Sequence, residues 1–238
     1  MLNAAGVTRS FGPVTAVQSL TLDVAPGELF CLLGANGAGK TTTINLFLGF
    51  LMPDTGTVTV GGIEPAVDPR ATRRMLAYIP ENVALYDQLT GLENLRLFCR
   101  MGDARLDDGE LQALLVRSGL TSDQTRRPVA GYSKGMRQKI GLAIAYARNA
   151  RALLLDEPLS GLDPSAASDF CDELARIREA GAAVLMTTHD LFRAKELGGA
   201  IGIMRDGSLV ETLQANDVDA RDLERLYLHH MRRPDGRP

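Results

Sequence analysis

The residues with the clearest chemistry form a short glycine-rich segment near the N-terminus. Residues 34–41 read Gly-Ala-Asn-Gly-Ala-Gly-Lys-Thr and follow the apolar residues 29–33. This spacing, between a strand and a helix, is typical of a loop that holds phosphate groups with backbone N–H groups. Glycines let the chain approach an anion closely, and the dipole of the following helix favours negative charge. The alternative, a glycine turn that only caps a helix, would produce this pattern by chance in about one in a hundred chains.

Each residue of this loop has an expected role in binding ATP. Lys40 would reach the β- and γ-phosphates and so also take part in catalysis, and the Thr41 hydroxyl would coordinate Mg²⁺. The expected cofactors are therefore ATP and Mg²⁺. The predicted ATP contacts are Gly34, Ala35, Asn36, Gly37, Ala38, Gly39, Lys40, Thr41 and Thr42.

Two neighbouring carboxylates follow a second apolar run. Residues 152–155 are Ala-Leu-Leu-Leu, and Asp156 and Glu157 come next. A strand buried on both faces would deliver these side chains to the carboxyl edge of a parallel sheet, where ligands of α/β proteins bind. There Asp156 would hold Mg²⁺, and Glu157 would polarise the water that attacks the γ-phosphate. Two acidic residues at a solvated strand end are the alternative interpretation.

His189 follows a third apolar run, residues 183–188. At the end of a strand its imidazole would hydrogen-bond the γ-phosphate and hold the attacking water and its base in line. A lone histidine beside Asp190, itself a suitable helix N-cap, is the plainer alternative. Without the glycine-rich loop and the two carboxylates, that alternative would be favoured.

Short β-rich runs and longer helical patterns alternate along the chain. They predict one α/β unit with a parallel sheet covered on both faces and a helical insertion. Pro26-Gly27 is a candidate hairpin turn, and the last ten residues have the composition of a loose tail. Strands are expected at residues 21–24, 28–33, 57–60, 152–156, 183–187 and 201–205. Helices are expected from about 39 to 49, over most of 81–150, and at 165–180.

Composition narrows the classes of partner. The 238 residues contain 26 basic and 29 acidic side chains, so the net charge of −3 gives no electrostatic reason to expect nucleic acid as a partner. Cys31, Cys99 and Cys171 match neither a metal-binding pair nor a disulfide framework, and we expect them to pack as small apolar residues. The apolar runs fall short of the ~20 residues that span a bilayer, and no leader is recognisable, so a cytosolic chain is expected.

The segment before the Asp156 strand links these features to a known family. Residues 132–138 read Tyr-Ser-Lys-Gly-Met-Arg-Gln and stand where the nucleotide-binding domains of ATP-binding cassette (ABC) transporters carry a Leu-Ser-Gly-Gly-Gln signature. The chain resembles that family over nearly its whole length. Ser133 is a good helix N-cap, and Gly135 keeps the backbone open at a positive helix end. The resemblance implies contacts in trans to ATP held by a second subunit, from Ser133, Lys134, Gly135 and Met136. A plain helix cap is the alternative.

Three further segments fit the same resemblance. Residues 160–163, Ser-Gly-Leu-Asp, resemble the D-loop and place Asp163 at the dimer interface, although Asp163-Pro164 is also a good helix start. Phe11 stands where the family has an aromatic residue that stacks on adenine, whereas a lone Phe is more often a core residue. Residues 78–81 resemble the Q-loop, which implies that Glu81 faces Mg²⁺ or the attacking water.

The chain also departs from the family pattern. Glu81 replaces the usual glutamine, and Lys134 and Met136 replace glycine and glutamine in the signature. These substitutions resemble the ABC-2 exporter subset. The resemblance implies an ATPase, converting ATP and water to ADP and phosphate, that dimerises on ATP and drives a separately encoded membrane permease. It further implies a peripheral position on the inner face of the cell membrane. An ABC ATPase in a regulatory or mechanical complex, or a pure nucleotide switch, is the alternative.

The expected fold class is an α/β P-loop NTPase core with a parallel sheet, an N-terminal antiparallel β subdomain and an inserted helical subdomain. The whole chain would form a single ABC ATPase domain. Its ATP-binding core with the β subdomain would comprise residues 1–80 and 151–215, its helical subdomain residues 81–150, and its C-terminal helix and loose tail residues 216–238.

Overall fold

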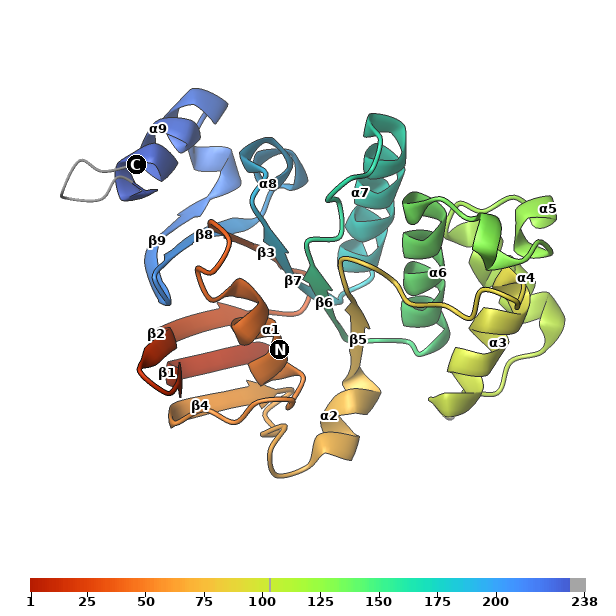
Figure 1. The fold of residues 1–238 in the computed structure, drawn as a ribbon, viewed down its shortest axis with the longest axis horizontal. Coiled ribbons are helices and arrows are strands. Elements are labelled where there is room, and N and C mark those ends of the chain that lie inside the picture. The colour runs from red at the N-terminus through yellow and green to blue at the C-terminus, as the bar shows by residue number, and fades with distance from the viewer. Residues whose placement is uncertain (103, 232–238) are drawn as a thin grey trace.

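The strands form two separate sheets. The computed structural model describes residues 1–102 and 104–231 (Figure 1). An antiparallel sheet contains β1 (Leu2–Phe11), β2 (Val14–Val24) and β4 (Thr55–Val60) in the order β2-β1-β4. A second sheet contains β3 (Leu29–Leu33), β5 (Leu76–Ile79), β6 (Ala152–Asp156), β7 (Ala183–Thr188), β8 (Ala200–Arg205) and β9 (Ser208–Gln214). Its order is β5-β6-β7-β3-β8-β9, with every pairing parallel except that of β8 with β9.

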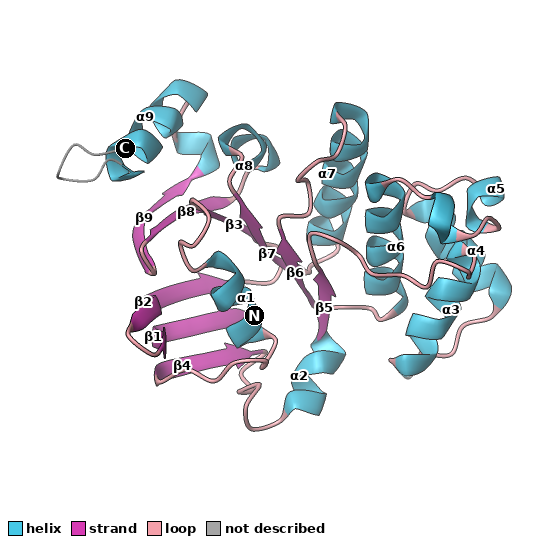
Figure 2. Ribbon diagram, in the orientation of Figure 1, coloured by secondary structure: helices cyan, strands magenta, loops and turns pink. Residues whose placement is uncertain are grey.

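The helices divide into two groups (Figure 2). Those associated with the sheets are α1 (Lys40–Phe47), α2 (Pro69–Met75), α7 (Pro164–Glu179), α8 (Leu191–Leu197) and α9 (Ala220–Met231), with the short 3-10 turn η2 (Ala215–Asp217). A helical lobe, on the right in Figure 2, contains α3 (Gly91–Met101), α4 (Asp108–Arg117), α5 (Ser122–Thr125), η1 (Val129–Gly131) and α6 (Lys134–Ala147). No helix in the described residues has the length and apolar character needed to cross a bilayer.

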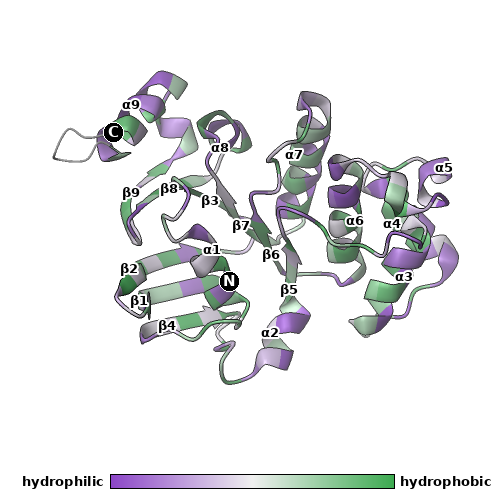
Figure 3. Ribbon diagram, in the orientation of Figure 1, coloured by the Kyte–Doolittle hydropathy of each residue, from purple (hydrophilic) through white to green (hydrophobic). Residues whose placement is uncertain are grey.

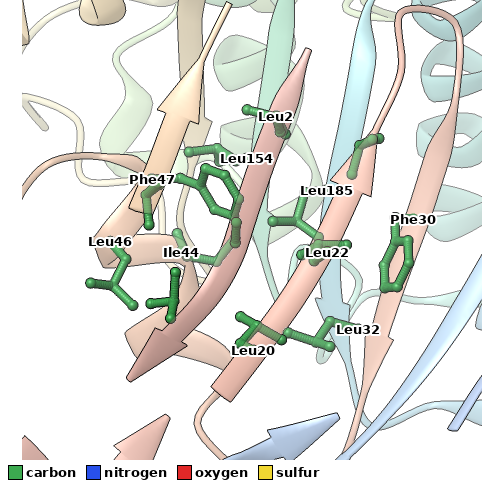
Figure 4. Close-up of a cluster of buried hydrophobic side chains, with 14 of the residues drawn as sticks. Leu2, Leu20, Leu22, Phe30, Leu32, Ile44, Leu46, Phe47, Leu154 and Leu185 are labelled. Carbon is green, nitrogen blue, oxygen red and sulfur yellow. The ribbon is translucent and has the colours of Figure 1, made fainter. Parts of the chain in front are cut away.

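The central strands β3, β6 and β7 are buried along their whole length. Their sequences are correspondingly apolar, and Figure 3 shows hydrophobic residues along them. On one face of the sheet, Phe47 of α1 packs with Leu154 of β6 and Leu22 of the small sheet (Figure 4). On the other face, Phe170 and Leu174 of α7 cover the strands. The predicted sheet covered on both faces is therefore confirmed, although β9 makes it mixed rather than wholly parallel.

The helical lobe has an apolar cluster of its own. Leu95 of α3, Leu111 and Leu115 of α4, and Ile140 of α6 are all fully buried there. Helix α6 also contacts β5 and α7, so it belongs to the lobe and to the core packing at once. This double packing attaches the lobe to the large sheet through α6.

Several predictions about elements need correction. Pro26-Gly27 does form a turn, with the Glu28 N–H donating to the Ala25 carbonyl at 3.1 Å, but it is not a hairpin. Strand β2 pairs with β1 in the small sheet, whereas β3 pairs with β7 and β8 in the large one. The turn therefore connects two layers, because the apolar β3 needs cover on both faces. Strands β1, β5 and β9 and helix α2 were not anticipated from the sequence, and of α8 only the capping Asp190 was.

The C-terminal prediction is wrong in one part. Residues 229–231 belong to α9, which buries Leu223 and packs on α8 and β8, so the last ten residues are not all a tail. The rest of the predicted tail, residues 232–238, lies outside the described residues. Cys31 and Cys99 are buried and Cys171 is half-buried, as expected for small apolar residues.

Candidate functional site

The predicted phosphate-binding loop connects β3 to α1. Gly39 is the N-cap of α1 with a positive φ of 105°, and a Cβ at this position would collide with the Ala16 carbonyl. Glycine is therefore required here both for its backbone angle and for space. Residues 35–42 line a cavity of about 270 Å³ together with Ala16, Glu81, Asp156 and Glu157. The loop and the carboxylates of Asp156 and Glu157, which are far apart in the chain, therefore face the same cavity.

Lys40 lies inside this loop with 6% of its side chain exposed. Its Nζ donates hydrogen bonds to the carbonyl oxygens of Gly34 at 2.6 Å and Ala35 at 3.2 Å, and lies 3.2 Å from Glu157 Oε1. The two carbonyl oxygens accept two of the three ammonium hydrogens, and the Glu157 carboxylate pairs with the charge. Phosphate oxygens bound in the cavity could replace them, so Lys40 is placed to exchange loop contacts for a ligand.

Both carboxylate oxygens of Glu157 face basic groups. Oε2 lies 2.9 Å from Nδ1 of His189, and Oε1 faces Lys40 but accepts no hydrogen bond from the described residues. Glu157 also has a positive φ of 48°, an uncommon backbone angle for a side-chain-bearing residue. That angle turns the chain sharply after β6. His189 itself is 59% exposed, so it reaches Glu157 while remaining accessible to a ligand.

Thr187 connects the two carboxylates and was missed by the sequence analysis. Its Oγ1 donates to Asp156 Oδ1 at 2.5 Å and accepts a hydrogen bond from the Glu157 N–H at 3.0 Å. The Thr187 side chain is completely buried in β7, directly opposite Asp156 in the parallel pairing of β6 with β7. The one signal in the sequence is a pair of hydroxyl residues, Thr187 and Thr188, at the end of an otherwise apolar strand. It points to a role only once the register is known.

The signature residues lie at the start of α6 and do not line this cavity. Ser133 is the N-cap, and its Oγ accepts the Met136 N–H at 3.3 Å. Gly135 is buried against Ala166 of α7, where an added Cβ would meet the Ala166 methyl group at 3.0 Å. The capping geometry is thus present, while the contact in trans of Ser133, Lys134, Gly135 and Met136 stays a prediction.

Comparisons with known proteins identify the family of this chain. Residues 17–160 match the ABC transporter family. The chain belongs to this family. An uncharacterised ABC transporter ATP-binding protein of Bacillus subtilis is 34% identical over 220 residues, which cover 92% of this chain and 71% of that protein. The bacitracin transport ATP-binding protein BcrA of Enterococcus faecalis is 31% identical over 223 residues, covering 93% and 72%. A solved ATP-binding subunit of an ABC transporter has a TM-score of 0.85 at 29% identity, covering 98% of this chain and 100% of that one.

The P-loop fold and ATP binding of this ABC ATPase are thereby shown, and its metal site can be tested against the residues present. No group of three or more His, Cys, Asp or Glu in the described residues could hold a metal ion. Mg²⁺ does not need one, because it usually binds through one or two protein oxygens and completes its shell with phosphates and water. Thr41 and Asp156 both line the cavity, and Asp156 is 8% exposed with only Oδ1 engaged by Thr187. This donor set fits Mg²⁺.

The Q-loop of this ABC ATPase is held by the signature helix. Glu81 lies on the cavity rim with 49% of its side chain exposed, and its Oε1 is 3.3 Å from Lys134 Nζ. Gln138 of α6 is completely buried and donates to the carbonyl oxygens of Pro80 at 3.1 Å and Glu81 at 3.0 Å. Gln138 was missed by the sequence analysis, because its partners are more than fifty residues away.

Phe11 and Asp163 lie outside the cavity lining. Phe11 is 46% exposed, with the Arg9 guanidinium 5.0 Å from its ring centroid, so the alternative of a core residue is wrong. Its stacking on adenine stays a prediction. Asp163 caps α7 by accepting the Ala166 N–H at 2.9 Å, and its place at a dimer interface also stays a prediction.

The hydroxyl of Tyr78, near the site, has a shifted pKa. Burial, and secondarily the nearby charge of Asp156, raise the pKa of the Tyr78 hydroxyl. Tyr78 is on β5 and pairs with Leu154 of β6, two residues before Asp156. The second of these effects follows from the position of Asp156 at the end of β6, the strand that pairs with β5.

Proposed function

We propose that this chain hydrolyses ATP with Glu157 as the general base and, as a dimer, drives export through a separate membrane permease. The observation that carries the hydrolytic part is the arrangement of Glu157, because Lys40 and His189 face its two carboxylate oxygens at the cavity formed by the P-loop. A base between two basic groups can accept a proton from water while the same groups contact the phosphate being attacked.

The proposed reaction is a direct attack of water on the γ-phosphorus. Glu157 takes a proton from the water as its oxygen bonds to phosphorus, and the bond to the oxygen bridging the β-phosphate breaks, releasing ADP and phosphate. Lys40 leaves the Gly34 and Ala35 carbonyls to bind the β- and γ-phosphates. His189 holds Glu157 through Nδ1 and offers its exposed edge to the γ-phosphate. Mg²⁺, held by Thr41 and Asp156, would neutralise charge on the phosphate oxygens.

The proposed dimer is inferred from the position of the signature residues. Ser133, Lys134, Gly135 and Met136 lie outside the cavity of their own chain, so in this proposal they close over ATP bound to a second copy. The N-terminus of α6, a helix of fourteen residues, is a suitable end for contacting a γ-phosphate. Asp163 would lie at the same interface. Loss of the γ-phosphate then removes the group that bridges the two copies.

The permease would dock in a basic groove between the core and the helical lobe. This groove, a cavity of about 540 Å³, is lined by Arg70, Arg73 and Arg74 of α2, by Phe98, Met101 and Gly102 at the end of α3, and by Ile144 and Arg148 at the end of α6. None of its four guanidinium groups forms an ion pair within the described residues. Met101 beside them is 70% exposed. Charge complementarity favours an acidic cytosolic segment of a membrane subunit with an apolar residue at its tip.

Export is the proposed direction. The support is the similarity to the bacitracin transport protein BcrA, together with Glu81, Lys134 and Met136 at the substituted positions. Binding to the permease would hold this chain at the inner face of the cell membrane. The alternative, an ABC ATPase in a regulatory or mechanical complex, would hydrolyse ATP equally well but would not co-purify with a membrane subunit.

Glu157→Gln tests the core of the proposal. The variant should bind ATP normally and lose turnover by about 10²–10⁴-fold, because the amide cannot accept the proton. With ATP it should also elute as a dimer in size-exclusion chromatography coupled to light scattering. Glu173→Gln is the control. It alters a buried carboxylate at a different place, on α7, and should keep its turnover. Near-normal hydrolysis by Glu157→Gln would remove Glu157 from the role of base, and a monomer at saturating ATP would contradict the clamp.

A further inference from the structure

Two of the positions at which this chain departs from its family contact each other. Lys134 Nζ lies 3.3 Å from Glu81 Oε1, although fifty-three residues separate them in the chain. Glu81 follows β5 and lines the nucleotide cavity, whereas Lys134 is the first residue of α6 and lies outside the lining. Glu81 in the Q-loop and Lys134 in the signature, both charged where the family usually has an uncharged residue, therefore form one ion pair within a single chain.

A second contact holds the same two segments together. Gln138, one helical turn after Lys134, donates to the Pro80 and Glu81 carbonyls and is completely buried. Residues four apart lie on the same face of a helix, so both side chains of α6 approach the Q-loop together. The Glu81 backbone is thereby anchored, which keeps its carboxylate at the rim of the cavity, close to Lys134.

The charges around the cavity give this pair a consequence for ATP. Its lining contains one ammonium group, that of Lys40, and three carboxylates, those of Glu81, Asp156 and Glu157. A triphosphate brings several more negative charges into the same space. An uncompensated carboxylate at the rim would repel it, and that repulsion is substantial over a few ångströms near a protein surface. Lys134 supplies the nearest positive charge to Glu81.

We infer that Lys134 is a positioning residue that neutralises Glu81 of its own chain and so allows the cavity to accept ATP. This inference rests on the proposed nucleotide site and assigns Lys134 a role in cis, separate from the predicted contact in trans. Lys134 acts through Glu81 rather than on the phosphates. Removing Lys134 should therefore weaken ATP binding only when position 81 carries a negative charge. If Lys134 contacted ATP directly, the effect would not depend on position 81.

The test is a double-mutant cycle on ATP affinity. Isothermal titration calorimetry with ATP in EDTA measures binding without hydrolysis and without a metal. Lys134→Met should raise the Kd roughly three- to tenfold, the size expected for one nearby charge, and Glu81→Gln should lower it or leave it unchanged. The double variant should bind within about twofold of Glu81→Gln alone. Lys134→Arg, which keeps the charge, should stay close to the unmodified chain.

Lys139→Met is the matched control. It removes a lysine of the same helix from another ion pair, with Asp169 at 2.9 Å, and Lys139 does not line the cavity. Its Kd should remain within about twofold of the unmodified chain. The increase caused by Lys134→Met should also shrink at high salt, because added ions screen the repulsion. Melting temperatures measured in parallel show that every variant is folded.

Each alternative gives a different pattern. If Lys134→Met raises the Kd equally with and without Glu81→Gln, Lys134 acts on the nucleotide directly and the inference is overturned. An effect no larger than that of Lys139→Met overturns it as well. If the unmodified chain fails to bind ATP at all, the nucleotide site of the proposed function is lost rather than the link between Lys134 and Glu81.

Discussion

At the scale of single residues, the reactive carboxylates depend on a hydroxyl that takes no part in the chemistry itself. Asp156 and Glu157 are adjacent in the chain, but in the proposed reaction Asp156 holds Mg²⁺ and Glu157 accepts a proton. Thr187 orients both, donating to the Asp156 carboxylate and accepting from the Glu157 N–H. Because Thr187 is completely buried in β7, its hydroxyl is held in place to make both contacts, and removing it loses both.

Thr187→Val should therefore lower kcat for ATP hydrolysis by roughly ten- to a hundredfold with little change in KM, because a small displacement of the base costs rate rather than binding. Steady-state phosphate release measures both constants. Thr187→Ser keeps the hydroxyl and should recover most of kcat. Thr125→Val removes a hydroxyl that is also buried but lies in the helical lobe, and it should lower stability without changing kcat. Equal kcat values for Thr187→Val and the unmodified chain would contradict the role in orientation.

At the scale of elements, α6 combines a structural end with a functional one. Its N-cap, Ser133, is also the signature serine, whereas α3 in the same lobe begins with a purely structural capping box at Thr90 and Glu93. Comparing the two N-caps therefore distinguishes the effect of capping a helix from the effect of a contact with ATP in trans. The interpretation of Ser133 as a plain cap and its interpretation as a signature residue make the same prediction for stability but not for the dimer.

Ser133→Ala and Thr90→Ala should each destabilise the fold by about 1 kcal/mol, the usual contribution of a cap. Urea unfolding measures this loss. In the Glu157→Gln background, only Ser133→Ala should weaken the dimer that forms with ATP, which light scattering over a range of ATP concentrations would detect. If both variants dimerise equally, Ser133 is only a cap and the signature acts through its other residues.

The packing of α6 on α7 should make stability depend on pH. Tyr146 of α6 donates to the buried Glu173 of α7 at 2.6 Å. Burial, and then this hydrogen bond, raise the pKa of Tyr146 from 10.0 to about 12. In the unfolded chain the hydroxyl ionises near its usual pKa, so between these two values the folded state holds a proton that the unfolded state has lost. The contribution of Tyr146 is therefore complete below pH 10 and decreases as the pH rises towards 12.

Tyr146→Phe should remove that dependence. Its free energy of unfolding should be lower than that of the unmodified chain at neutral pH, and the difference should narrow as the pH rises above about 10. Urea unfolding monitored by circular dichroism at several pH values gives both curves. Parallel curves, with a constant difference across this range, would show that folding does not raise the pKa of Tyr146.

At the scale of the whole molecule, the nucleotide cavity and the basic groove share α6. Its first turn holds Glu81 through Lys134, and its last turn lines the groove through Ile144 and Arg148. The groove also uses α2 of the core and α3 of the lobe, so it widens or narrows whenever the lobe moves relative to the sheet. In the proposed transporter, α6 would therefore connect a change at the nucleotide to a permease bound in the groove.

Arg70→Glu combined with Arg74→Glu should abolish co-purification with the permease from detergent-solubilised membranes and leave ATP hydrolysis by the isolated chain within about twofold. Reversing two charges replaces attraction of an acidic segment by repulsion. Arg126→Glu combined with Arg127→Glu, two exposed positions in the helical lobe outside the groove, is the control and should co-purify normally. Retention of the permease by the groove variant would place the docking surface elsewhere.

Much of the site could be predicted from the sequence because its parts are local. The loop of residues 34–41 contains its own glycines, lysine and helix start, so its geometry follows from consecutive residues. Asp156, Glu157 and His189 could be placed at strand ends for the same reason, since parallel strands bring their carboxyl ends to one edge. The alternation of apolar runs with helical patterns was likewise enough for the fold class.

Only the tertiary structure decided which distant residues meet. The register that sets Thr187 opposite Asp156 depends on β7 lying next to β6, and nothing in either strand specifies that neighbour. The same holds for the contact of Lys134 with Glu81, and for β2 and β3 entering different sheets after one short turn. Sheet order and lobe docking arise from burying apolar surface across the whole chain, a global balance that local spacing cannot encode.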